Sequence, residues 1–237
     1  MSPKRRVAVM TAVFATFGIG VSAAIIAANG GFSGAPPTVP TDEDIWVVGS
    51  NIQDGTVLEY SLDSKGPSSS LVSSLVTLNF VESGNDWNVT FSVKNGTSEE
   101  ITRTIVMSKE LTREGSLDES FAPYFEPIQT SILAVRDMEY GDSPKYLVVG
   151  APWNTIFVGP STFTVRVTGE ETVETRAGSF ASFVLSYELD DEISRIWMVD
   201  TMPLPVKATT FDEADQPYYS FELLRASAVG SPQPEPL

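Results

Sequence analysis

Apolar and polar residues alternate along much of this chain. The clearest run is Trp87 to Lys94, in which every second side chain is large and apolar. A period of two places successive side chains on opposite faces of a strand, so this run predicts a strand with one buried and one wet face. Strand-like runs also occur at Ile45–Val48, Thr56–Leu62, Leu71–Glu82, Ile101–Met107, Tyr146–Gly150, Thr162–Thr168, Glu171–Thr175, Phe180–Leu189, Ile193–Val199, Val206–Phe211 and Tyr218–Leu224.

Turn-forming residues separate these runs by short gaps. Asn95-Gly96 is a strong tight-turn pair, and Arg176–Ser179 and Asp190-Asp191 also join adjacent runs. Short gaps favour antiparallel hairpins. Pro203 and Pro205 cannot donate to a sheet ladder, so they mark an edge or the entry to a strand. We therefore predict a mainly β fold built on a single curved antiparallel sheet resembling a half-barrel.

The middle of the chain changes to a helical period. Ser116–Glu119 matches a capping box, and five apolar residues then follow at spacings of three and four, namely Phe121, Phe125, Ile128, Ile132 and Val135. Pro127 would kink or end such a helix. We expect either one short or broken helix that covers the concave face of the sheet, or a short helix followed by a strand through Ile132 to Tyr140.

The N-terminal segment is long and apolar. Val7 to Ala28 carries no charge, Lys4–Arg6 precede it directly, and the next basic residue is Lys65. A helix of that length spans roughly 33 Å, and the positive-inside rule keeps the N-terminus in the cytoplasm. We predict a transmembrane anchor in residues 1–28; a cleaved signal peptide is the alternative, and the domain is extracytoplasmic in both cases. A Gly/Pro linker at 29–41, a β-rich domain at 42–226 and a disordered tail at 227–237 complete the organisation.

Composition excludes several kinds of chemistry. The chain lacks cysteine and histidine, which removes disulfides, thiol nucleophiles, imidazole catalysis and the usual transition-metal ligands. Its net charge of −16 argues against binding to nucleic acid and to anionic lipid head groups. Acidic clusters at Asp42–Asp44, Asp190–Glu192 and Asp212–Asp215 have no calcium-loop spacing, so we expect no metal and no cofactor.

The segment RAGSFASFVLSYELDDEISRIWMVDTMPLPVKATTF, within Arg176 to Leu224, resembles a pattern of uncharacterised envelope proteins that include archaeal membrane-anchored ones. Its succession of turns and apolar strands looks like the later hairpins of half-barrel envelope domains similar to the lipoprotein-carrier fold. The resemblance implies a strongly curved antiparallel sheet around a helix or an apolar cavity. It implies no agreed activity.

Candidate sites are few. Asn88-Val89-Thr90 and Asn95-Gly96-Thr97 are sequons for N-glycosylation. Asn88 falls on the wet face of its predicted strand and Asn95 in a turn, so we expect both to be exposed and glycosylated. Trp153, Phe157 and Trp197 are the aromatic side chains that we select as candidate ligand contacts, although ordinary core packing is the better general explanation of such residues.

The first functional hypothesis is a membrane-tethered, extracytoplasmic, non-enzymatic binding or structural domain. Its partner would be an apolar ligand or another envelope protein. The second is a carrier or sensor that holds a lipid in the curved sheet. A carboxylate-based hydrolase is a distant third, since no pair among the 31 acidic residues stands out.

Overall fold

The computed structural model describes residues 40–65, 71–137, 145–158, 161–189, 192–212 and 214–229. The predicted anchor Val7 to Ala28 lies outside these residues. In the part of the chain that is described, no helix combines the length and the hydropathy required to cross a bilayer.

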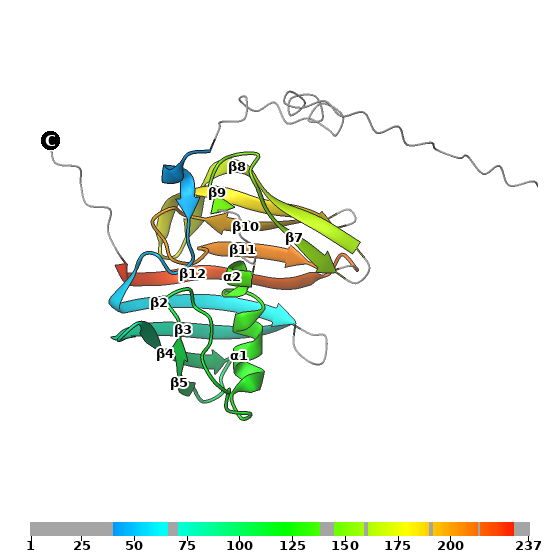
Figure 1. The fold of residues 1–237 in the computed structure, drawn as a ribbon. Coiled ribbons are helices and arrows are strands. Elements are labelled where there is room, and N and C mark those ends of the chain that lie inside the picture. Colours follow the sequence, from blue (N-terminus) through cyan, green and yellow to red (C-terminus); the bar gives the residue numbers. More distant parts are fainter. Residues whose placement is uncertain are drawn as a thin grey trace, which may run out of the picture. The chain divides into compact units, whose positions relative to one another are not determined.

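One large antiparallel sheet forms the body of the domain (Figure 1). From one edge to the other, its hydrogen-bonded strands follow the order β5 (Ile101–Met107), β4 (Asp86–Asn95), β3 (Leu71–Ser83), β2 (Ile52–Lys65), β12 (Pro217–Val229), β11 (Lys207–Phe211), β10 (Glu192–Met198), β9 (Gly178–Leu189), β8 (Ser161–Thr175) and β7 (Pro152–Val158). The sheet is not closed, because β5 and β7 are its two edges. The predictions of a mainly β fold and a large antiparallel sheet are therefore confirmed.

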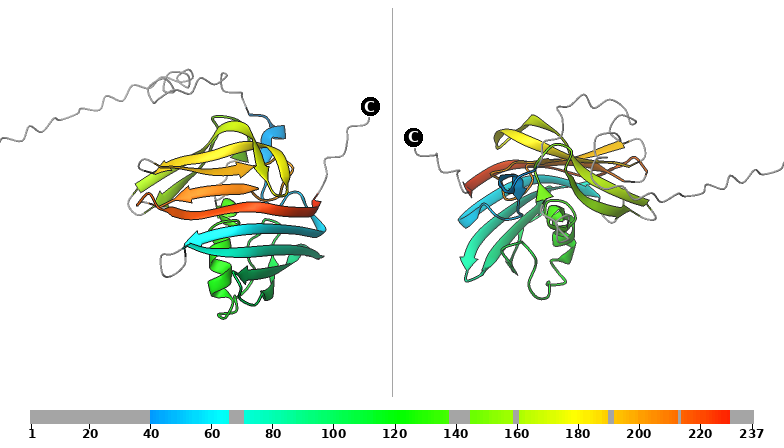
Figure 2. Two further views of the ribbon diagram at one scale, coloured as in Figure 1. Left: turned by 180° about the vertical axis from the view of Figure 1, so that it is seen from behind. Right: turned by 45° about the horizontal axis from the view of Figure 1, so that its top comes forward.

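Curvature gives the sheet a concave side, and the two short helices lie against it (Figure 2). Register shifts at Val167/Gly169 in β8 and at Leu223/Arg225 in β12 mark bulges, which bend and twist a strand. The bulge at Val167/Gly169 lies between the two predicted runs Thr162–Thr168 and Glu171–Thr175, which form one strand, β8. A small separate ladder pairs β1 (Ile45–Trp46) with β6 (Lys145–Tyr146), and the 3-10 turn η1 (Asp42–Asp44) precedes it.

The register of β3 and β4 follows the alternation of the sequence. Leu78 lies opposite Phe91 and Phe80 opposite Val89, and all four side chains are buried on the concave side.

The prediction of a strand at Tyr146–Gly150 is wrong beyond Tyr146. That segment ends in a turn because Gly150 adopts a φ of 93°. β12 continues to Val229, beyond residue 227 where the tail was expected to begin.

Helix α1 (Ala122–Gln129) begins later than the capping box predicts. Instead of a cap at Ser116, the carbonyl of Asp118 accepts the N–H groups of Phe121 and Ala122 at 2.9 and 3.1 Å. The Asp118 carboxylate accepts two hydrogen bonds from Ser120, which lower its pKa. The predicted capping box is wrong because these bonds hold residues 118–121 in turns rather than in a helix.

The broken-helix prediction is confirmed, and the alternative of a strand from Ile132 is wrong. Pro127 lies inside α1, which ends two residues later, and turns lead to α2 (Ala134–Asp137). Proline supplies no N–H for the helical ladder, which accounts for the early end. Phe125 and Ile128 on α1, and Phe121 directly before it, are fully buried, and the Phe125 ring meets Phe91 edge to face at 5.2 Å.

A cleft between α1 and the ends of β2, β3 and β4

A cleft of about 700 Å³ lies between α1 and the concave side of the sheet. Its helical wall consists of Glu119, Ala122, Pro123, Tyr124, Glu126, Pro127, Ile128 and Thr130. The facing wall belongs to β2, β3 and β4, and consists of Leu62, Ser64, Lys65, Val72, Ser74, Val76, Val93 and Asn95. The volume falls within the range of about 300–1,000 Å³ that is usual for small-molecule sites.

The sequence creates this space by changing side-chain size along the strands. Beside Phe125 of α1, the sheet presents the large side chain of Phe91. Towards the cleft, the inward positions of β3 are Val72 and Ser74, and Ser74 lies opposite Asn95. Small side chains leave the room that aromatic rings fill elsewhere.

The accessible lining is part apolar and part polar. Leu62, Val76 and Val93 are only 1%, 0% and 3% exposed, so these apolar side chains form the innermost part of the lining. Nearer the opening, the half-buried Val72 and Pro127 provide apolar surface, whereas Ser74, Asn95 and Thr130 provide hydroxyl and amide groups. The Ser74 hydroxyl donates to the Asn95 side-chain oxygen at 2.7 Å. Such a lining suits an amphipathic ligand better than a wholly apolar one.

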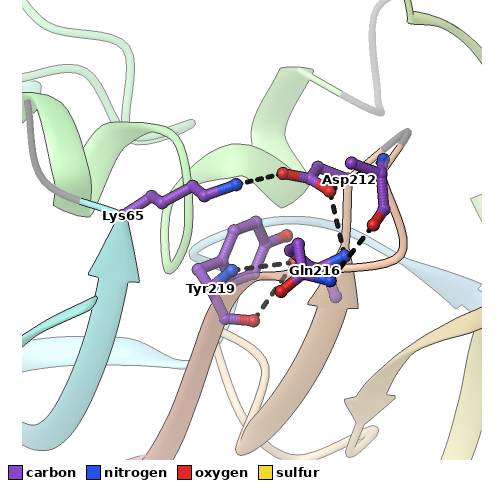
Figure 3. A network of polar contacts seen from close by, with 6 residues as sticks. Lys65, Asp212, Gln216 and Tyr219 are labelled. Atoms are coloured by element: carbon purple, nitrogen blue, oxygen red, sulfur yellow. Dashed lines mark hydrogen bonds and ion pairs between the residues drawn. The ribbon is translucent and has the colours of Figure 1, made fainter. Parts of the chain in front are cut away.

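Lys65 is the cation among the described lining residues, and it is already paired. Figure 3 shows its ammonium group directed at the carboxylate of Asp212, in the loop between β11 and β12. That carboxylate also accepts the N–H groups of Gln216 at 3.0 Å and Ala214 at 2.9 Å. The bond from Lys65, and then those from the backbone, lower the pKa of Asp212. The positive charge at this end of the cleft is therefore compensated.

The same close-up includes Tyr219 on the neighbouring strand (Figure 3). Its N–H donates to the Thr210 hydroxyl at 3.3 Å, and that hydroxyl donates to the Tyr219 carbonyl at 3.1 Å. Burial raises the pKa of the Tyr219 phenol. This side chain is therefore neutral at physiological pH and contributes packing rather than charge.

The predicted aromatic contacts do not belong to this cleft. Trp153 is 2% exposed, its indole N–H donates to the Tyr146 carbonyl at 2.8 Å, and its ring lies 5.5 Å from that of Trp46. Trp197 is half-buried, and its indole N–H donates to Glu171 at 2.6 Å. Neither of these two lines the cleft, and the side chain of Phe157 on β7 lies outside the described residues. Ligand contact by these three residues stays a prediction.

The two sequon asparagines are half-buried rather than exposed as predicted, and they occupy different settings. Asn88 is half-buried on the outward face of β4, opposite the exposed Val81 and Val106 of the flanking strands. Asn95 ends β4 and lines the cleft. A glycan on Asn95 would therefore stand beside the opening, whereas one on Asn88 would cover the outer face of the sheet.

A second cavity, of about 480 Å³, lies near the turn before β2 and is bordered by charged groups. The Lys109 ammonium lies 3.5 Å from the centre of the Trp87 ring and 3.0 Å from a carboxylate oxygen of Glu82. The chain's own lysine thus covers the aromatic face that a cationic ligand would use.

Metal ligation finds no support in the described part of the chain, where no three carboxylates gather in a suitable arrangement. Asp44 instead accepts hydrogen bonds from the N–H and the hydroxyl of Thr41, at 2.7 and 2.8 Å. Local turn formation accounts for this acidic cluster.

Comparison with known proteins shows resemblance in structure alone. The sequence matches no protein-family model and no curated protein. A protein described as exported, with a YmcC-like fold, from Bacteroides fragilis NCTC 9343 is similar with a TM-score of 0.37 and 10% identity over 78% of this chain and 99% of that one. MucB is similar with a TM-score of 0.39 and 14% identity over 78% of this chain, and the MucA/MucB complex of Pseudomonas aeruginosa gives 0.38 and 15% over 77%. The match spans about half of MucB, at 56% and 54% of those chains. Similarity at this level carries no argument about function. The functional proposal is therefore based on the cleft.

Proposed function

We propose that this chain is a membrane-tethered, extracytoplasmic binding domain without catalytic activity, and that its ligand occupies the cleft beside α1. The observation that carries the proposal is the space of about 700 Å³ between α1 and the strand ends, with its mixed lining. The tether rests on the sequence alone, on the uncharged segment Val7 to Ala28 and the basic residues before it.

The ligand that fits best is a single hydrocarbon chain with a polar head. The Phe125 ring already packs on Phe91 of β4, so the space open to a ligand is the cleft farther along the strands. Carriage or sensing of a lipid is therefore the second candidate function, favoured by the apolar side chains Val72 and Pro127. A protein of the envelope that presents one apolar side chain is a further kind of partner for the same cleft.

Photolabelling tests the site directly. The full-length chain in phosphatidylcholine nanodiscs is irradiated with dodecanol that carries a diazirine at mid-chain, and the labelled peptides are identified by mass spectrometry. We expect label on the peptides that contain Ser74 and Pro127. The variant Val72→Trp fills the cleft and should lose most of this label.

Leu75→Trp is the matched control, because Leu75 lies on the opposite face of the same strand and is 40% exposed. It should label like the wild type. Equal labelling of the two variants, or label spread evenly over the outer face of the sheet, would refute the proposed site.

A further inference from the structure

Two carboxylates border the cleft without a counter-charge among the described residues. Glu119 and Glu126 are exposed, and both line the cleft from the side of α1. Neither side chain makes a hydrogen bond or an ion pair with another described residue. Lys65, on the opposite wall, is neutralised by Asp212. The opening of the cleft therefore has a negative potential, in a chain whose net charge is −16.

Most apolar side chains of the lining are more buried than its two glutamates. Val72, Ala122 and Pro127 offer apolar surface within the cleft, and Leu62 and Val76 close its floor. The carboxylates belong to exposed residues, so a ligand that points its hydrocarbon chain inwards would place its head group near them.

We propose that this cleft selects cationic amphiphiles, namely hydrocarbon chains that carry an ammonium head group. The inference rests on the proposed function and adds the charge of the ligand to it. An ammonium head gains Coulomb attraction from both carboxylates, whereas a carboxylate or phosphate head is repelled. A hydroxyl head gains nothing from the charge and serves as the neutral reference.

The test uses the full-length chain in phosphatidylcholine nanodiscs with three mid-chain diazirine probes: dodecylammonium, dodecanol and dodecanoate. Labelling of the cleft peptides is normalised to labelling of the nanodisc lipid, which removes differences in partitioning. The ammonium head can form an exposed ion pair with each of Glu119 and Glu126, which should favour labelling by dodecylammonium over dodecanol by roughly three- to tenfold at low salt. Dodecanoate should label least, and the preference should shrink below roughly twofold in 1 M salt.

Charge variants separate a local effect from the general acidity of the chain. The double variant Glu119→Gln/Glu126→Gln should label equally with dodecylammonium and dodecanol. The control Glu170→Gln/Glu188→Gln removes the same number of charges from exposed positions of β8 and β9, and should keep the wild-type preference.

The outcomes distinguish the inference from the proposed function. Equal labelling by dodecylammonium and dodecanol in the wild type would overturn the charge preference and leave the binding site in place. An unchanged preference in Glu119→Gln/Glu126→Gln would likewise overturn it. Absence of cleft label with all three probes would overturn the proposed function itself.

Discussion

Phe125→Ala removes the ring that ties α1 to the sheet. Phe125 is fully buried and meets Phe91 edge to face, with ring centres 5.2 Å apart and planes at 89°. Truncation of a buried phenylalanine costs about 3–5 kcal/mol. The specific aromatic contact accounts for about 0.5–1.5 kcal/mol of that cost, and the lost burial and the cavity account for the rest.

Urea unfolding followed by far-UV circular dichroism measures the loss, with Gln129→Ala as a half-buried control on the same helix. In thermal unfolding, the melting temperature of a domain of this size should fall by about 6–20 °C, at about 2–4 °C for each kcal/mol. A double-mutant cycle with Phe91→Ala isolates the pair. A loss below about 1 kcal/mol, or no coupling between the two sites, would refute the packing of α1 described above.

Three further predictions concern acid stability, backbone strain and modification. The pKa of Asp212 is lowered in the folded state, so its contribution to stability is present above the ordinary pKa and is lost as the pH falls through the folded value. The difference in melting temperature between wild type and Asp212→Asn should therefore be largest near pH 7 and should diminish as the pH falls below about 4. A difference that is independent of pH would contradict this assignment. Gly49→Ala should destabilise the fold by at least about 1–2 kcal/mol in urea unfolding, because φ is 75° and the new Cβ would lie 2.6 Å from the Lys109 carbonyl oxygen; unchanged stability would contradict that strain. Intact-mass measurement of natively made protein should detect glycan at Asn88 or Asn95, with loss of mass when the threonine of the occupied sequon is replaced by valine, and an unmodified mass would end the prediction.

Local alternation predicted the strands well because each strand has one buried and one wet face. β4 shows this best, since Trp87, Val89, Phe91 and Val93 are all buried. The bounds of the helix were harder to predict. Its apolar spacing was visible, but its start depends on hydrogen bonds around Asp118, which a capping-box pattern at Ser116 does not reveal.

The cleft could not be predicted from local patterns, because it depends on which strand ends face α1. Val72 and Ser74 look like ordinary strand residues until the register places them opposite β2 and β4. The spacing of Pro123, Glu126 and Pro127 on one helical face was the available signal. Trp153 is one of the candidate ligand contacts in the sequence, yet the ring it packs against, that of Trp46, lies over a hundred residues earlier in the chain.

Native mass spectrometry of the full-length chain, purified gently from the cells that make it, shows whether the cleft is occupied. We expect one bound amphiphile per chain, with a hydrocarbon chain and an ammonium head group, retained by Leu75→Trp and missing from Val72→Trp. A wild-type chain that carries no ligand, or equal retention by both variants, would contradict binding in the cleft beside α1.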